Sequence, residues 1–440
     1  MSNTVDSQAL MALALDEAKR LGADQAEVAV SQDTGLSATA RLGDVENLEY
    51  TNDRGFGITV FRSSRKGNAS TSDLSEAAIR EAVAKACGFA NCTAEDPYAG
   101  LADADRMCRD IPALDLDHPW ALEASAAIEL AIECEATALA FDKRIKNSEG
   151  STVGSNRGVR SYANSHGFFG TYAKTSHSIS CVVLGEADGD MQRDYYYSAS
   201  RDADELESPR LIGETAARRA VERLGAVKLE TRSAPVLFVP ELAKGFIGHS
   251  IAAIAGGAQY RKSTFLLDAV GQKVFPEWLS IDERPHIPKA MASTPYDGEG
   301  VATYDRSVFR DGVLEGYMLS SYSARRLGLE TTANAGGAQN LIVSANASGF
   351  DELLKQMDTG LIVEELIGHG VNAVTGDYSR GAVGHWVEGG EVKYPVHEVT
   401  IAGNLKELYK SIVAVGEDRD VRGGIRCGSL LVDGMTIAGA

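Results

Sequence analysis

The spacing of apolar and polar residues changes repeatedly along the first part of the chain. Near the N-terminus, apolar residues recur three to four positions apart and end at Gly22, which predicts a helix with the stripe Leu10, Leu13, Ala14, Ala18 and Leu21. Residues 26–30 alternate between apolar and polar, the period of a half-buried strand. The alternation returns at 56–60, after residues 52–55, which we interpret as a turn.

Helical spacing returns several times later in the chain. One helix is predicted behind the capping pair Asp73 and Glu76, with the apolar stripe Ile79, Ala82, Val83, Ala86 and Ala90. Longer helices are predicted over about 120–141, 208–224 and 241–255. In the remainder of the chain only about 350–357 and 405–412 have a helical pattern.

Glycines punctuate short runs of Tyr, Thr, Ser and Val between about 147 and 200, which is typical of antiparallel hairpins. Asp311-Gly312 and Gly389-Gly390 have the composition of hairpin connections in the C-terminal half. We therefore predict an α+β fold. Helices pack on a sheet in an N-terminal domain, residues 1–230. A β-rich domain of mostly antiparallel strands follows, residues 231–440, with the boundary in the polar stretch 230–233.

Composition narrows the class of partner. The 440 residues carry 43 Lys+Arg against 62 Asp+Glu, a net charge of −19, which argues against binding nucleic acid or an anionic membrane. The sequence has no apolar run of membrane-spanning length and no secretory signal pattern at its N-terminus. Its 6 cysteines form no Cys-x-x-Cys, so we expect free, mostly buried thiols and a cytoplasmic location.

Most common catalytic motifs are absent from the sequence. Neither a phosphate-binding loop nor a Gly-x-Ser-x-Gly elbow occurs, and Gly55-Phe56-Gly57 lacks the third glycine of a dinucleotide site. His397-Glu398 begins a zinc-protease pattern, but no second histidine follows at a suitable offset. We interpret that pair as part of a strand.

His249 is the most informative histidine, because it lies in a helical segment that is poor in charge. Neither Ala253 nor Ile254, one turn further on, can bind a metal, which favours a hydrogen-bonded core histidine. A site completed by distant residues stays open, with His369, His385 and Cys427 as candidates by residue type.

Ordered segments across nearly the whole chain resemble the TldD/PmbA family of metallopeptidases. They include Arg261-Lys262-Ser263-Thr264 after the His249 helix, Arg426-Cys427-Gly428-Ser429 near the end, and the segments 22–28, 54–57, 296–301, 309–314, 323–328, 331–337, 394–396 and 401–404. In this family the TldD type carries His-Glu-x-x-x-His on the corresponding helix and a C-terminal Cys as a further zinc ligand. The chain departs from that motif and is similar to the TldE (PmbA) subunit.

The resemblance implies that this chain has no metal, catalytic or cofactor-binding residues of its own. His249, Ser250 and Cys427 stand at the positions of a degenerate site. It also implies a heterodimer with a TldD-type subunit that carries zinc. Together the two subunits would degrade unfolded proteins or peptides, or mature modified peptides.

Two other functions stay open from the sequence. The chain is then either an autonomous, atypical metallohydrolase that uses His249 and Cys427, or a non-enzymatic homodimeric binding or scaffold protein. The metal content of the purified chain distinguishes an autonomous metallohydrolase from a supporting subunit. Co-purification with a TldD-type partner distinguishes a supporting subunit from a binding or scaffold protein. Homodimerisation of the lone chain is a further open possibility.

Overall fold

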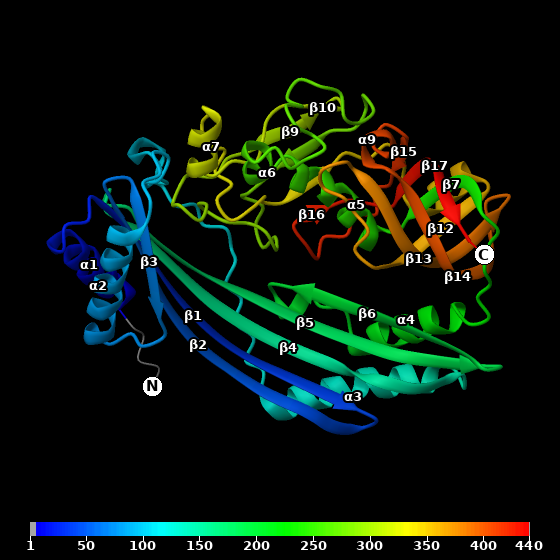
Figure 1. Ribbon diagram of the computed structural model, residues 1–440. Coiled ribbons are helices and arrows are strands. Elements are labelled where there is room, and N and C mark those ends of the chain that lie inside the picture. Colours follow the sequence, from blue (N-terminus) through cyan, green and yellow to red (C-terminus); the bar gives the residue numbers. More distant parts are fainter. Residues whose placement is uncertain (1–5, 440) are drawn as a thin grey trace.

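A curved antiparallel sheet forms the N-terminal half of the molecule (Figure 1). The computed structural model describes residues 6–439. The six strands lie in the order β3-β2-β1-β4-β5-β6, and four of them have 17 to 20 residues. Their bounds are β1 (Gln25–Arg41), β2 (Asp44–Arg62), β3 (Arg65–Thr71), β4 (Ile145–Asn164), β5 (Phe169–Ala187) and β6 (Asp190–Ser200).

Helices cover the convex face of this sheet because one set of alternating strand residues is apolar. Val28, Val30, Phe56 and Ile58 pack under α1 (Ser7–Arg20) and α2 (Glu76–Cys92) at one end. Leu36, Ala38, Val153 and Ile179 pack under α3 (Ala124–Phe141) and α4 (Pro209–Glu222) at the other. The opposite, concave face is turned toward the C-terminal half (Figure 1).

The C-terminal half is built on a strand ladder that closes on itself. Its order is β14-β13-β12-β7-β17-β15, and β14 also pairs with β17, so five strands form a barrel. A second, five-stranded sheet has the order β10-β9-β8-β11-β16. The strands are β7 (Arg232–Phe238), β8 (Ile281–Glu283), β9 (Arg306–Arg310), β10 (Val313–Leu314), β11 (Leu341–Val343), β12 (Gly360–Ile367), β13 (Asp377–Glu388), β14 (Glu391–Asn404), β15 (Ile412–Val415), β16 (Ile425–Arg426) and β17 (Leu430–Ala438).

The helices of this half are mostly short. They are α5 (Pro240–Ala253), α6 (Gly256–Tyr260), α7 (Ser321–Leu327), α8 (Phe350–Met357) and α9 (Leu405–Leu408). Phe246 of α5 packs against Phe238, Tyr378 and Tyr409, with ring centroids 5.1–5.7 Å apart, and so fixes α5 on the barrel core. No helix within residues 6–439 is long and apolar enough to cross a membrane.

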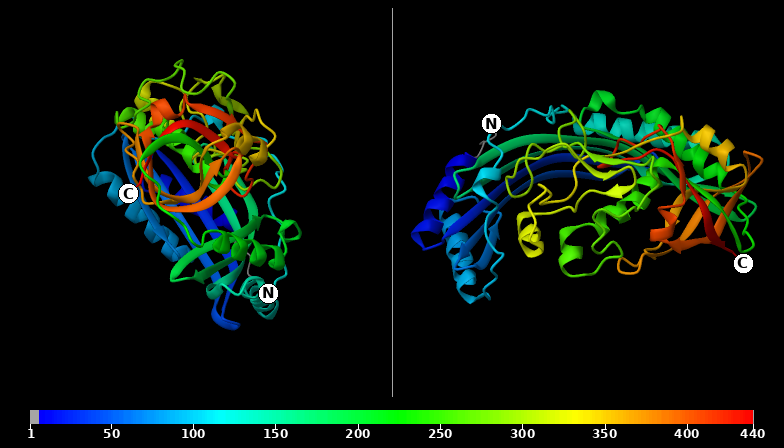
Figure 2. Two further views of the ribbon diagram at one scale, coloured as in Figure 1. Left: turned by 90° about the vertical axis from the view of Figure 1, so that its right-hand side faces the viewer. Right: turned by 90° about the horizontal axis from the view of Figure 1, so that it is seen from above.

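Buried charges join the two halves, which lie against each other in all three views (Figures 1 and 2). Arg223, just after α4, contacts Asp194 of β6 at 2.8 Å and Glu365 of β12 at 2.5 Å. Both Arg223 and Asp194 are almost fully buried. Removing one member leaves the other charge unpaired in the interior, which is costly.

The predicted α+β class is confirmed, and the predicted helices 241–255 and 350–357 correspond to α5 and α8. The turn predicted at 52–55 is wrong: β2 runs through these residues, and Asp53 pairs with Asp33. Asn, Asp and Gly are tolerated there because this stretch is solvent-exposed. The sequence pattern also missed α6 and α7, and it extended α9 by a turn. Each is too short for helical periodicity to show.

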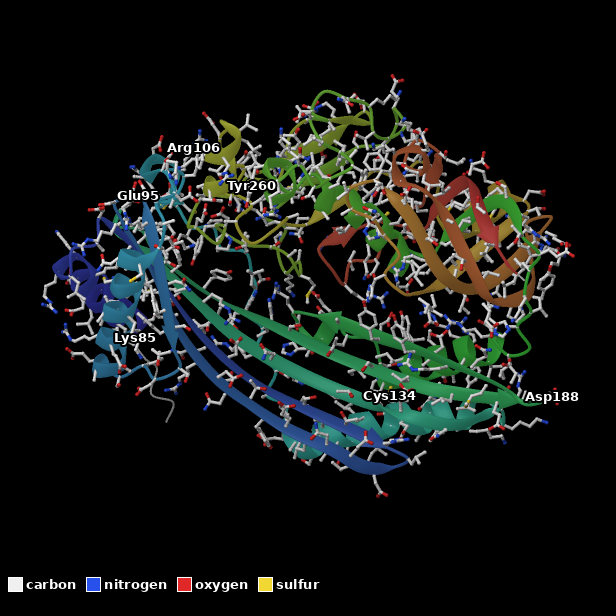
Figure 3. All side chains as sticks on the ribbon, in the orientation of Figure 1. Lys85, Glu95, Arg106, Cys134, Asp188 and Tyr260 are labelled. Atoms are coloured by element: carbon white, nitrogen blue, oxygen red, sulfur yellow. The ribbon has the colours of Figure 1, made fainter. Side chains whose placement is uncertain are left out.

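Two helical glycines provide a matched test of the packing between α3 and α4. A Cβ on Gly213 of α4 would lie 2.3 Å from the carbonyl oxygen of Cys134, which lies on α3 (Figure 3). A Cβ on Gly88 of α2 would meet open space. We expect Gly213→Ala to lower the free energy of unfolding by about 1–3 kcal/mol through overpacking. Gly88→Ala is expected to raise it by about 0.5–1 kcal/mol. Urea denaturation measures both, and equal effects would contradict the close helix contact.

Candidate functional site

Helix α5 carries His249 as the sequence predicts, with its side chain half-buried. The imidazole packs edge-on against Tyr378, with ring centroids 6.1 Å apart. Burial lowers the pKa of His249, and the positive charge of Arg380 lowers it further. The ring is therefore neutral at physiological pH, the form that can bind a metal.

Ser250 and Cys427 are not free to help His249. The Ser250 hydroxyl is buried and donates a hydrogen bond to the carbonyl of Ile247 at 2.7 Å. Cys427 is fully buried in the barrel core, where burial raises the pKa of its thiol well above the usual range. Because zinc binds the thiolate, a metal bound there would have to displace this proton, and burial adds to that cost.

The other candidate histidines lie apart from this helix and have partners of their own or face solvent. His385 contacts Glu364 at 3.0 Å through Nδ1 and the carbonyl of Glu222 at 3.2 Å through Nε2. Burial is the largest single influence and acts to lower the pKa of His385, but the hydrogen bond and charge of Glu364, together with the contact to Glu222, raise the pKa overall. His369 is exposed after β12. His397-Glu398 lies within β14, as predicted, and Glu398 pairs with Lys228 at 2.5 Å.

The residues around α5 do not fit a zinc ion. Across residues 6–439, no three His, Cys, Asp or Glu side chains come together in an arrangement that could hold a metal. The buried Nε atoms of Arg380 and Arg426 lack hydrogen-bond partners within the described chain. Arg380 acts on His249, and Arg426 immediately precedes Cys427. The positive charge of Arg380 acts on His249 and opposes the binding of a cation there.

A cavity of about 640 Å³ lies between the concave sheet face and the C-terminal half. Its wall includes Arg160, Tyr172 and Lys174 of the sheet, and Tyr296 and Asp297 of a C-terminal loop. Sequence reasoning identified none of these as site residues. The alternation of polar residues along 158–174 was the available signal, but a pattern of this kind does not show which sheet face is covered.

Asp297 is a buried carboxylate in the wall of this cavity. It accepts hydrogen bonds from the backbone N–H groups of Glu299, Val301 and Ala335, at 2.9–3.0 Å. Burial, with the nearby charge of Glu299, nevertheless raises the pKa of Asp297 to about 7. The cavity therefore contains an acid that changes charge near neutral pH.

Comparison with known families matches three successive parts of the chain. Family models of the PmbA/TldA metallopeptidases match residues 26–90 as domain 1, residues 117–224 as the central domain and residues 231–439 as the C-terminal domain.

Relatives match over nearly their whole length. The metalloprotease PmbA of Escherichia coli O157:H7 is 50% identical over 416 residues, covering 94% of this chain and 92% of that protein. A metalloprotease PmbA homologue of Haemophilus influenzae is 48% identical, covering 98% and 95%. The structure of a proposed modulator of DNA gyrase from Bacteroides thetaiotaomicron has a TM-score of 0.94 at 27% identity, covering 99% and 100%. TldE from Thermococcus kodakarensis shares the fold, with a TM-score of 0.84 at 20% identity, covering 98% and 100%.

Asp297 makes stability depend on pH in a defined direction. Its pKa is about 7 in the folded chain and about 4 in the unfolded chain, so the folded state binds more protons between these values. We expect its contribution to stability to fall as pH rises from about 4 to 7, by up to about 1.4 kcal/mol per pH unit. Urea midpoints at several pH values, for wild type and Asp297→Asn, isolate this slope.

The control for Asp297 is Asp311→Asn, at an exposed hairpin turn. This variant should keep the wild-type pH profile. An Asp297→Asn profile parallel to wild type would contradict the assignment, whatever its absolute stability.

Proposed function

Because the chain belongs to the PmbA/TldD metallopeptidase family, we propose that it is the zinc-free, supporting subunit of a two-subunit peptidase. Its partner is a TldD-type subunit that holds the zinc. One observation carries this proposal: within residues 6–439 no group of three potential metal ligands forms around His249 of α5, and Arg380 places positive charge near that histidine.

The relatives' names support a peptide-processing role, since several are metalloproteases. We propose unfolded polypeptides and peptides as substrates, because a cavity behind a curved sheet admits an extended chain more readily than a folded domain. The work of this chain is then to shape the chamber and contact the substrate. We place the pair in the cytoplasm, where six unpaired cysteines remain reduced.

An exposed edge of the N-terminal sheet is a suitable surface for the partner. β3 pairs with β2 only from Phe56 onward, so residues 44–54 of β2 have no neighbour on that side within the described chain. This edge carries three apolar side chains, Val45, Leu48 and Tyr50, which are 40–68% exposed. They lie on the same face of the sheet as their partners on β1, and α3 covers those partners but not the β2 residues. Glu135 of α3 accepts hydrogen bonds from the backbone N–H groups of Leu42 and Gly43, which fixes the hairpin. We therefore propose that the TldD-type subunit covers this edge.

The main test is zinc content and casein hydrolysis, measured for this chain alone and mixed with its TldD-type partner. We expect zinc and activity only where the partner is present. His249→Ala in this chain should leave activity of the pair within about twofold of wild type, because the histidine holds no metal. The matched control replaces the glutamate of the partner's His-Glu-x-x-x-His motif by Gln, and that change should abolish hydrolysis.

Other outcomes separate the alternatives. Stoichiometric zinc in the lone chain, lost in His249→Ala or Cys427→Ser, would identify an autonomous metallohydrolase. A stable homodimer that never associates with the partner would identify a binding or scaffold protein.

The β2 edge gives a separate prediction about assembly. Leu48→Asp combined with Tyr50→Glu should weaken association with the partner at least about tenfold, because charge replaces apolar contact at the centre of the surface. Met191→Glu is the control, since Met191 is exposed on β6 at the opposite edge of the sheet. Sedimentation velocity measures both variants, and unchanged association of the double variant would move the interface elsewhere.

A further inference from the structure

The cavity under the C-terminal half is one part of a longer groove on the concave face of the sheet. It adjoins a second cavity of about 250 Å³, with which it shares Ala29, Gly57, Ser70, Tyr162 and Gly298. The second adjoins a third of about 420 Å³, with which it shares Glu27 and Asn68. We call this series the concave groove. Its two larger parts, of about 640 and 420 Å³, have the size of ligand pockets in proteins.

Small residues form the floor of the concave groove. In the strand register, Ser70, Gly57 and Ala29 lie side by side on β3, β2 and β1, and Gly55 lies next to Ser31 two residues further along. A Cβ on Gly57 would meet nothing within 4 Å. Main-chain atoms of the sheet are therefore accessible there, and the space above them suits an extended ligand.

A cation without a partner marks one end of the groove. Lys174 of β5 is half-buried in its wall and makes no side-chain hydrogen bond or ion pair with any residue from 6 to 439. Asp33, the acid that acts on it, is already bound to Arg160 at 2.7 Å. Burial lowers the pKa of Lys174, and the charges of Arg201 and Arg160 lower it further. An anion bound there would offset all three effects.

Two acids mark the other end. Glu27 of β1 accepts a hydrogen bond from the Tyr162 hydroxyl at 2.8 Å, and Glu299 lines the same cavity. Neither forms an ion pair within the described chain. Burial raises the pKa of Glu27 and the repulsion of Glu299 adds to this, while the hydrogen bond from Tyr162 and the charge of Lys66 only partly oppose the rise. A cation bound at this end would offset the burial and the repulsion and so favour the charged form of Glu27.

The distance between the ends sets the size of the ligand. Lys174 pairs with Gly158, which pairs with Asp33, so Lys174 lies in the row of Asp33. Asp33 and Glu27 are six residues apart on β1, or about 20 Å at 3.3 Å per residue, and Lys174 lies two strands or about 10 Å to the side, so the ends are about 22 Å apart. An extended peptide of about six residues has the same length.

We propose that the concave groove binds a short peptide with free termini, its carboxylate at Lys174 and its ammonium group at Glu27 and Glu299. The inference rests on the proposed peptidase function for the origin of such peptides, but binding itself needs neither the partner nor zinc. Opposite charges at the two ends fix the direction of the peptide. The small residues of the floor leave room for its side chains, so selection acts on the termini and length more than on sequence.

Calorimetry on the full-length lone chain tests the proposal. The probe is a hexapeptide of alternating alanine and serine, in three forms: free termini, C-terminal amide and N-terminal acetyl. We expect the free form to bind at least about tenfold more tightly than either capped form, because each cap removes one charge-assisted contact. Lys174→Met should remove the preference for the free carboxylate, and Glu27→Gln should reduce the preference for the free amine.

Controls make the result specific. Lys146→Met changes an exposed lysine of β4 outside the groove and should leave all affinities unchanged. Circular dichroism checks that each variant folds. Equal binding of free and capped peptides, no binding at all, or an unaltered carboxylate preference in Lys174→Met would overturn the proposal. If the lone chain binds the peptide but the mixed subunits never hydrolyse casein, only the proposed peptidase function is refuted. Active subunits without this binding would refute only the groove assignment.

Discussion

Strands of 17 to 20 residues extend about 60 Å, and backbone pairing leaves both faces of such a sheet in need of cover. No single helix pair of this chain is long enough for that. The convex face is covered at one end by α1 and α2 and at the other by α3 and α4. The concave face receives the C-terminal half (Figure 1). Of the two surfaces that we assign to binding, the β2 edge lies where this cover ends, and the concave groove begins between the sheet and the C-terminal half.

The contact between the halves depends on polar groups as well as packing. Besides Arg223, Asp194 and Glu365, a second set of charges joins α4 to the C-terminal half through Arg219 and Glu241, 2.8 Å apart. Arg325 of α7 holds the segment after α2 by donating to the carbonyls of Tyr98 and Gly100. Directional contacts of this kind fix the relative position of the halves, and with it the depth of the groove.

The spacing of apolar residues predicts correctly those helices that bury one face along their whole length. The stripe Ile79 to Ala90 is buried in α2 as expected, and Ser208 caps α4. The same spacing predicts the wrong structure where a residue's conformation depends on a strand that is distant in the sequence. Residues 52–55 have turn composition, yet pairing with Asp33 and its neighbours makes them a strand. His249 was placed on its helix, but its relation to Arg380 and Tyr378 depends on barrel closure, which no short spacing encodes. Lys174 and Glu27 were missed for the same reason.

The composition of the β2 edge affects more than its accessibility. Residues 44–54 carry four acids, Asp44, Glu46, Glu49 and Asp53, against one base, Arg54. If two copies of this chain met along that strand, carboxylates would face carboxylates, and like charges across paired strands are unfavourable. A different strand with basic residues at those places would meet no such repulsion. The composition of this edge therefore disfavours pairing with a second copy of itself and favours a strand of opposite charge.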